Sequence, residues 1–181
     1  GSYWNGSAWQ AGAAYLATTH ASTTDGSSTA WTSAAGTLPA DWSSITDGTY
    51  TVTAIATDRV GNTFTGTPIS FILDSTAPQV SSIVRAGSDP TNAASVVFTV
   101  TFDSIVTGVT TGAFSVRVDP DPSIAGATVV SVSPTSGSSA TWTVTVATGA
   151  GEGFLYLDLT DTTGIADLAL IPLAGTFTAG Q

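Results

Sequence analysis

The feature of this sequence that most constrains its fold is an alternation of hydroxyl and apolar residues. Residues 49–57 read Thr-Tyr-Thr-Val-Thr-Ala-Ile-Ala-Thr. Successive side chains of a β-strand point to opposite faces of a sheet, so this pattern predicts a strand with one solvated face. Similar segments recur at intervals of about ten residues, which is typical of an all-β sandwich. They predict further strands at 68–73, 80–84, 95–102, 114–118, 128–132, 141–146 and 154–159.

Two features predict how these strands are connected and grouped. Asn5-Gly6 lies between Tyr3-Trp4 and Ala8-Trp9, and an Asn-Gly pair flanked in this way predicts a tight hairpin with a primed turn. The segment 74–79 contains Pro78, which cannot donate to a strand ladder. We therefore expect two modules, residues 1–77 and 78–181, connected by a short, semi-rigid joint.

The composition excludes several classes of function. The chain has 13 acidic residues, three arginines and no lysine, for a formal net charge of −10. This charge repels nucleic acid and anionic lipid, so we expect neither as a partner. No apolar run approaches the roughly 20 residues of a membrane-spanning helix, so we expect no membrane insertion. The absence of cysteine excludes disulfides and thiolate metal sites.

Several spaced motifs near the end of the first module occur together in one known family. They are Asp47-Gly48-Thr49-Tyr50-Thr51-Val52, then Ala56-Thr57-Asp58-Arg59-Val60-Gly61-Asn62, and finally Asp74-Ser75-Thr76-Ala77-Pro78. In this order they resemble the last strands of bacterial immunoglobulin-like repeats. The resemblance implies two tandem immunoglobulin-like sandwiches from a large surface or adhesin-like protein. The second module resembles a related repeat, but it departs from the pattern at Ala166–Leu170, where such repeats carry D-x-x-G-N.

The resemblance also implies that strands are missing at both ends. Family repeats have strands before the Tyr3–Trp9 hairpin and a closing strand after Phe177. Either the chain is a piece of a longer array, or neighbouring copies complete each other's sheets by strand addition. In the second case the self-assembly residues Tyr3, Trp4, Trp9 and Phe177 lie against a neighbouring copy.

Catalytic groups are sparse in this sequence. His20 is the single histidine and lies among hydroxyl residues, whereas a catalytic triad needs a base between a nucleophile and an acid. Asp119 and Asp121 lie in a proline-stiffened acidic loop, which a solvated turn explains. We therefore predict that the protein is not an enzyme. An enzyme would require these residues to share a cleft.

Calcium is the cofactor that the acidic residues favour. Ca²⁺ takes six to eight oxygen ligands from carboxylates and carbonyls. If the first module folds as its relatives do, Asp58, Asn62 and Asp74 lie at the joint, where Asp103 of the second module approaches them. The alternative is that Asp58 and Asn62 only stabilise a turn by bonding to their own backbone.

These observations predict a non-catalytic, extracellular structural or adhesive module at a bacterial cell surface. We expect a subunit of a filament, stalk or adhesin that is assembled by strand pairing with other copies or adjacent repeats. A glycan or another cell-surface ligand is a further expected partner. The alternative is a carbohydrate-binding ancillary module of a secreted hydrolase. An exposed planar row of tryptophans would favour that alternative, although Trp142 lies in an alternating strand and is expected in the core.

Overall fold

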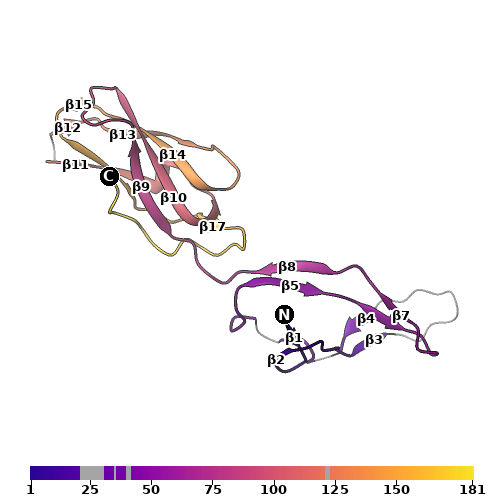
Figure 1. Cartoon of the computed structure of the whole chain (residues 1–181). Helices are drawn as coiled ribbons and strands as arrows, with labels where there is room; N and C mark the ends of the chain where they lie inside the picture. Colours follow the sequence, from indigo (N-terminus) through magenta and orange to yellow (C-terminus); the bar gives the residue numbers. More distant parts are fainter. Residues whose placement is uncertain (21–30, 35, 40–41, 121–122) are drawn as a thin grey trace. The chain divides into compact units, whose positions relative to one another are not determined.

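The computed structural model is all-β, as the alternation predicts, and its strands pair in antiparallel fashion (Figure 1). It describes the chain except residues 21–30, 35, 40–41 and 121–122. The described residues contain no α-helix. They form two compact units, Gly1–Thr46 and Asp47–Gln181, which are considered separately.

The first unit consists of two short hairpins. The strands are β1 (Ser2–Trp4), β2 (Trp9–Ala11), β3 (Thr18–His20) and β4 (Trp31–Ser33), with β1 paired to β2 and β3 to β4. The predicted hairpin around Asn5-Gly6 is confirmed. Its loop is residues 5–8, since Trp4 pairs with Trp9, and within this loop only Gly6 has a positive φ, of 102°, so the primed turn centred on Asn5 and Gly6 is not formed.

The second unit begins with a long, irregular hairpin. Its strands are β5 (Gly48–Val52), β6 (Ile55–Thr57), β7 (Thr63–Thr65) and β8 (Ile69–Leu73). β5 pairs with β8 and β6 pairs with β7, so the chain runs out along β5 and β6 and returns along β7 and β8. The ladder is interrupted between the two pairs, where the Gly66 amide donates to the Ala54 carbonyl.

One sheet of the sandwich is built around the long strand β10 (Ser95–Thr107). Alternate β10 residues Val96, Phe98, Val100 and Phe102 are buried, as a strand covered on one face requires. The other strands of this sheet are β9 (Val80–Ala86), β13 (Thr128–Ser133), β14 (Ser139–Ala147) and β17 (Ala166–Asp167), in the order β13-β14-β10-β17 with β9 also paired to β10.

The opposing layer is formed by the paired strands β11 (Phe114–Asp119) and β16 (Phe154–Leu159). The single-turn 3₁₀-helix η1 (Thr111–Ala113) precedes β11, and a short pair of strands, β12 (Ile124–Ala125) and β15 (Ala150–Gly151), lies between β11 and β16 in the sequence. Leu157 and Leu159 of β16 belong to the same buried core cluster as Phe98, Val144 and Trp142 of the first sheet. All of the buried hydrophobic residues of the described chain lie between Ile83 and Leu173. Trp142 is therefore a core residue, as predicted.

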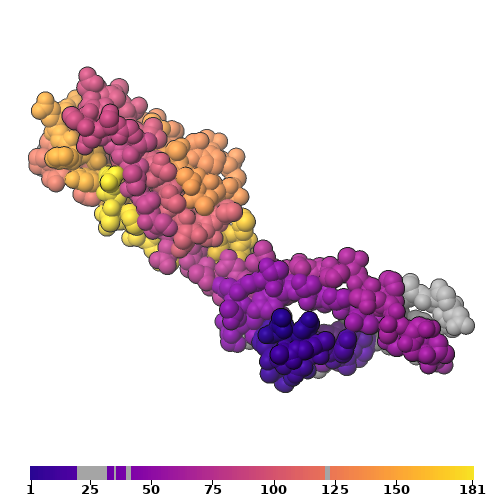
Figure 2. Space-filling view, viewed as in Figure 1, coloured from indigo at the N-terminus to yellow at the C-terminus, as the bar shows by residue number. Residues whose placement is uncertain are grey.

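The C-terminal segment bears on one prediction. Phe177 exchanges backbone hydrogen bonds with Leu159, and Gln181 accepts from the Leu157 amide and donates to the Ile83 carbonyl. Residues 177–181 therefore bridge β16 and β9 within their own chain, beside β9 in Figure 2. Phe177 also packs against the core of its own chain. The backbone of this segment is thus hydrogen-bonded within its own chain, through an isolated bridge at Phe177 and not as an assigned strand, where the prediction has it against a neighbouring copy.

The compact units divide at a different place from the predicted joint between residues 77 and 78. Hydrogen bonds connect the joint segment to the sandwich: the Ala174 amide donates to the Pro78 carbonyl, and the Gln79 amide donates to Asp103. The hairpin 47–74 and the sandwich consequently belong to one unit.

Candidate functional site

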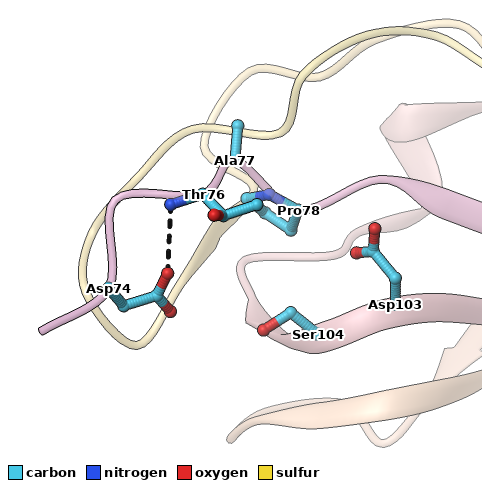
Figure 3. Close-up of a pocket in the computed structure, with 6 residues that line it drawn as sticks. All are labelled: Asp74, Thr76, Ala77, Pro78, Asp103 and Ser104. Carbon is cyan, nitrogen blue, oxygen red and sulfur yellow. Dashed lines mark hydrogen bonds between the residues drawn. The ribbon is translucent and has the colours of Figure 1, made fainter. Parts of the chain in front are cut away.

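The joint segment lines a shallow pocket of about 260 Å³ between β8 and β10. Asp74 and Asp103 approach it from two different elements, Asp74 from the chain leaving β8 and Asp103 from β10 (Figure 3). The remaining lining residues are Thr76, Ala77, Pro78 and Ser104. The structure thus brings together two of the four predicted calcium ligands.

Both carboxylates of this pocket are used in part by the local backbone. Oδ1 of Asp74 accepts a hydrogen bond from the Thr76 amide at 3.1 Å. Oδ1 of Asp103 accepts one from the Gln79 amide at 2.8 Å. Asp74 therefore stabilises the chain just before Pro78, and Asp103 stabilises the chain just after it, whether or not an ion is present.

The other two predicted ligands lie elsewhere. Asp58 and Asn62 form the turn between β6 and β7, at the far end of the hairpin from Asp74. Gly48 pairs with Leu73 and Thr57 with Thr63, so about nine residues of strand, or roughly 30 Å, separate the two ends. Asp58, Asn62, Asp74 and Asp103 do not form one site. The described residues contain no cluster of three or more acidic or histidine side chains arranged to hold a metal ion.

The Asp58–Asn62 turn is held by the aspartate side chain. Oδ1 of Asp58 accepts from the amides of Val60 and Asn62, and Oδ2 accepts from the Asn62 side-chain amide at 2.7 Å. These hydrogen bonds, with the Asn62 side chain contributing most, lower the pKa of Asp58 below its ordinary value. The interactions are those of the turn-stabilising alternative.

Asp47 makes a comparable clamp at the other end of the hairpin. Its carboxylate accepts from the Ser75 amide, from the Ser75 hydroxyl at 2.6 Å and from the Thr76 hydroxyl at 2.6 Å. Hydrogen bonds from the Ser75 and then the Thr76 side chain lower the pKa of Asp47. This clamp ties the start of β5 to the chain that follows β8.

A second turn with the geometry of Asp58–Asn62 occurs at Asp167–Ile171, in the segment where the sequence departs from the D-x-x-G-N pattern of the repeats that it resembles. Oδ1 of Asp167 accepts from the amides of Ala169 and Ile171, at 2.8 and 2.9 Å. The backbone bonds also match, since Asp167 N donates to Ile171 O and Leu170 N to Asp167 O, as Asp58 N donates to Asn62 O and Gly61 N to Asp58 O. Leu170 has a φ of 66°, and Gly61 at the equivalent position has a φ of 93°.

The two turns differ in the environment of the second carboxylate oxygen. Asp167 is 1% exposed, and its Oδ2 is buried with no hydrogen-bond partner among the described residues. In the first turn the Asn62 side chain occupies the matching position, but Ile171 replaces it here. The single sequence signal for this turn is the aspartate itself, because the glycine and asparagine are absent.

The N-terminal aromatic residues predicted for self-assembly form a small cluster in the first unit. Trp4 and Trp9 are directly paired across the β1–β2 hairpin, and their rings meet edge to face with centroids 5.6 Å apart and an interplanar angle of 61°. Trp4 Nε1 donates to the Thr37 carbonyl at 2.8 Å. Tyr3 and Trp9 are 47% and 37% exposed. These two tryptophans do not form a planar row.

The β5–β8 pair carries an exposed apolar face. The register places Tyr50 opposite Phe71 and Val52 opposite Ile69 on one face, and the rings of Tyr50 and Phe71 stack with centroids 5.8 Å apart. Val52, Ile69 and Phe71 are 52%, 73% and 41% exposed. An isolated two-stranded hairpin with such a face is only marginally stable in water.

The outer face of the β11–β16 pair carries a cation held over an aromatic ring. Arg117 lies opposite Tyr156, with its guanidinium carbon 4.2 Å from the ring centroid. Arg117 Nε donates to Oδ2 of Asp158 at 3.0 Å, and this hydrogen bond is the main cause of the raised pKa of Arg117. The Asp158 side chain is 7% exposed and that of Arg117 is 46% exposed. Sequence reasoning missed this pair because it depends on the strand register.

The residues weighed for catalysis gain no support. Asp119 lies at the end of β11, whereas Asp121 and the side chain of His20 lie outside the described residues. Asp119 lines neither of the two pockets described, of which the second lies between β11 and β13.

Comparisons of the chain with protein-family models, with curated proteins and with solved structures found no match. No helix in the described part of the chain is long and apolar enough to cross a membrane. The function must therefore be argued from the chain's own geometry.

Proposed function

We propose that this chain is a non-catalytic, extracellular structural and adhesive module built from immunoglobulin-like sandwiches. It serves in a bacterial surface filament, stalk or adhesin and associates through its N-terminal strands with other copies or adjacent repeats. The observation that carries the proposal is the uneven distribution of apolar residues. Among the described residues, the buried core cluster lies within Ile83–Leu173, with Val80 and Phe177 packed against it, whereas the β5–β8 hairpin exposes Val52, Ile69 and Phe71.

Exposed apolar strands favour association. A hairpin needs a further strand or a covering layer to be stable, and an exposed apolar patch marks an interaction surface. An unpaired strand edge also offers backbone donors and acceptors to an added strand. Tyr3, Trp4 and Trp9 of the N-terminal hairpin supply a second, aromatic surface for association. Calcium between Asp74 and Asp103 would reduce carboxylate repulsion at the joint.

The test is size-exclusion chromatography with light scattering, followed by electron microscopy, with and without millimolar calcium. We expect concentration-dependent oligomers or filaments. The double substitution Ile69→Thr and Phe71→Thr should shift the chain to monomer. Ile72→Thr is the matched control, because Ile72 is 77% exposed on the opposite face of the same strand. A calcium-indifferent monomer at all concentrations would reject self-assembly.

A carbohydrate-binding module is the second candidate. The predicted planar tryptophan row is not formed by Trp4 and Trp9, whose rings are tilted by 61°, and Trp142 is buried. A different surface, the outer face of β11 and β16, supports carbohydrate binding on independent grounds.

A further inference from the structure

We propose that the outer face of β11 and β16 binds a carboxylate-bearing sugar, a uronic acid, with Arg117 as the carboxylate ligand. This inference goes beyond the proposed structural role and does not depend on self-assembly. It rests on the side chains that the β11–β16 register places in three successive rows. The rows are Ser115 with Asp158, Arg117 with Tyr156, and Asp119 with Phe154.

The guanidinium of Arg117 is held in place while its terminal nitrogens remain available. Asp158 accepts from Nε, and the Tyr156 ring supports the guanidinium plane. Among the described residues, neither Nη1 nor Nη2 donates a hydrogen bond. A planar guanidinium presents these two nitrogens as a fork that matches a carboxylate, and the opposite charges are complementary.

The buried Asp158 is what distinguishes this arginine from an ordinary surface cation. Oδ1 of Asp158 is buried without a partner, and Oδ2 is bound by Arg117 alone. The carboxylate therefore favours the one Arg117 conformation that compensates it, which reduces the rotamer entropy lost on ligand binding. The other two arginines are arranged differently: Arg85 is paired with exposed Asp89, and Arg59 lies in the β6–β7 turn.

The neighbouring row supplies a surface for a sugar ring. Phe154 is 62% exposed and lies two residues from Tyr156 on the same strand face, at a separation of about 7 Å. The C–H face of a pyranose packs against an aromatic ring, and its hydroxyls need acceptors such as the exposed carboxylate of Asp119. A uronic acid combines a pyranose ring, which can pack against Phe154, with a carboxylate that Arg117 can bind.

The net charge of −10 does not prevent this binding at physiological salt. The Debye length is about 8 Å at 0.15 M ionic strength, so acids beyond that distance are largely screened. Asp158 is neutralised by Arg117 itself. Asp119, one row away on the same face, also acts on Arg117 and would repel a ligand carboxylate, so the carboxylate of the sugar must point away from Asp119.

The test is titration of the ¹⁵N-labelled full chain with galacturonate, followed by amide chemical shifts. We expect shifts confined to 115–119 and 154–158, and a Kd of about 1–10 mM, as suits a subsite with few contacts. Galactose, which lacks the carboxylate, and acetate, which lacks the ring, should each bind at least about tenfold more weakly.

Two variants and two matched controls test the assigned residues. Arg117→Lys keeps a charge beside Asp158 but loses the fork, and Phe154→Ala removes an exposed ring without disturbing the core. Each should weaken galacturonate binding about tenfold, whereas Arg59→Lys and Phe64→Ala, at exposed positions on the hairpin, should leave it unchanged. Equal binding of galactose or acetate, unchanged binding by both site variants, or no shifts at 115–119 and 154–158 would overturn the proposal. Those results would leave the filament test unaffected.

Discussion

The turns Asp58–Asn62 and Asp167–Ile171 share one hydrogen-bond pattern but are built from different residues. In both, an aspartate accepts two backbone amides, and the fourth residue has a positive φ. The first turn has Gly61 and Asn62 at its last two positions, and the second has Leu170 and Ile171. The comparison teaches that the aspartate defines the turn, whereas glycine and asparagine only reduce its cost.

Burial is the second difference between the turns. Asp58 and its partners are exposed, while Asp167 is 1% exposed beside β10. Water can replace a lost hydrogen bond more readily in the first turn than in the second, whose hydrogen bonds are partly buried. Equivalent substitutions should therefore have unequal effects.

The largest effect is expected for Asp167→Ala. The substitution leaves the amides of Ala169 and Ile171 without their acceptor, and each partly buried orphan costs about 1–3 kcal/mol, so we expect a loss of about 2–4 kcal/mol in the free energy of unfolding. Urea denaturation measures it. Asp167→Asn keeps an acceptor oxygen and should lose less than half as much, and Asp58→Ala should lose less than Asp167→Ala. Equal losses for the two alanine variants would show that burial does not separate the turns.

The next effect concerns the residue with positive φ. Leu170→Gly should increase the free energy of unfolding by about 0.5–1 kcal/mol, because relief of left-handed backbone strain exceeds the added entropy of glycine in the unfolded chain. Leu170 is 81% exposed, so little packing is lost. The reciprocal change Gly61→Ala meets no atom within 4 Å and should lower stability by about 1 kcal/mol through strain alone. A destabilised Leu170→Gly would mean that Leu170 makes an interaction that the strain argument omits.

A smaller effect is expected on the pH dependence of stability. The pKa values of Asp47, Asp58 and Asp161 are lowered in the folded chain, chiefly by hydrogen bonds from Ser75, Asn62 and Thr163 respectively. Because the folded pKa lies below the unfolded value of 3.8, their contribution is present above that pH and is lost as the pH falls through the folded pKa. The urea concentration at the midpoint of unfolding should therefore decrease when the pH is lowered below about 4. Asp47→Asn should make this decrease in stability at low pH smaller. An unchanged pH dependence would exclude the hydrogen bonds of Asp47 to Ser75 and Thr76 as a contributor.

The smallest effect tests the role of the Asn62 side chain directly. Asn62→Ile reproduces the residue of the second turn and removes the donor to Oδ2 of Asp58. The pKa of Asp58 should rise toward its ordinary value, since the largest cause of its lowering is removed. Carboxyl carbon NMR titration measures the shift, with Asp161 as an internal reference. A pKa of Asp58 that stays unchanged would assign its lowering to the backbone amides.

Much of the fold was predictable because the side chains of a strand point alternately to its two faces, so a half-buried strand has an alternating sequence. The strand predicted at 154–159 coincides with β16, and those at 128–132 and 114–118 each fall one residue short of β13 and β11. The candidate sites were less predictable. Asp74 and Asp103 do line one pocket, but Asp58 and Asn62 lie at the opposite end of the hairpin, because the chain continues through β6 before it turns.

The sequence by itself determined the all-β class, the faces of the strands, the core position of Trp142 and the turn at Asp58, because each depends on residues close together in the chain. Only the tertiary structure decided that residues 177–181 hydrogen-bond to β16 and β9, that Asp167 is buried and that Arg117 meets Tyr156 and Asp158. These contacts join residues distant in sequence. Their existence depends on the register of paired strands and on how the strands and loops pack together, and neither property produces a recognisable local sequence pattern.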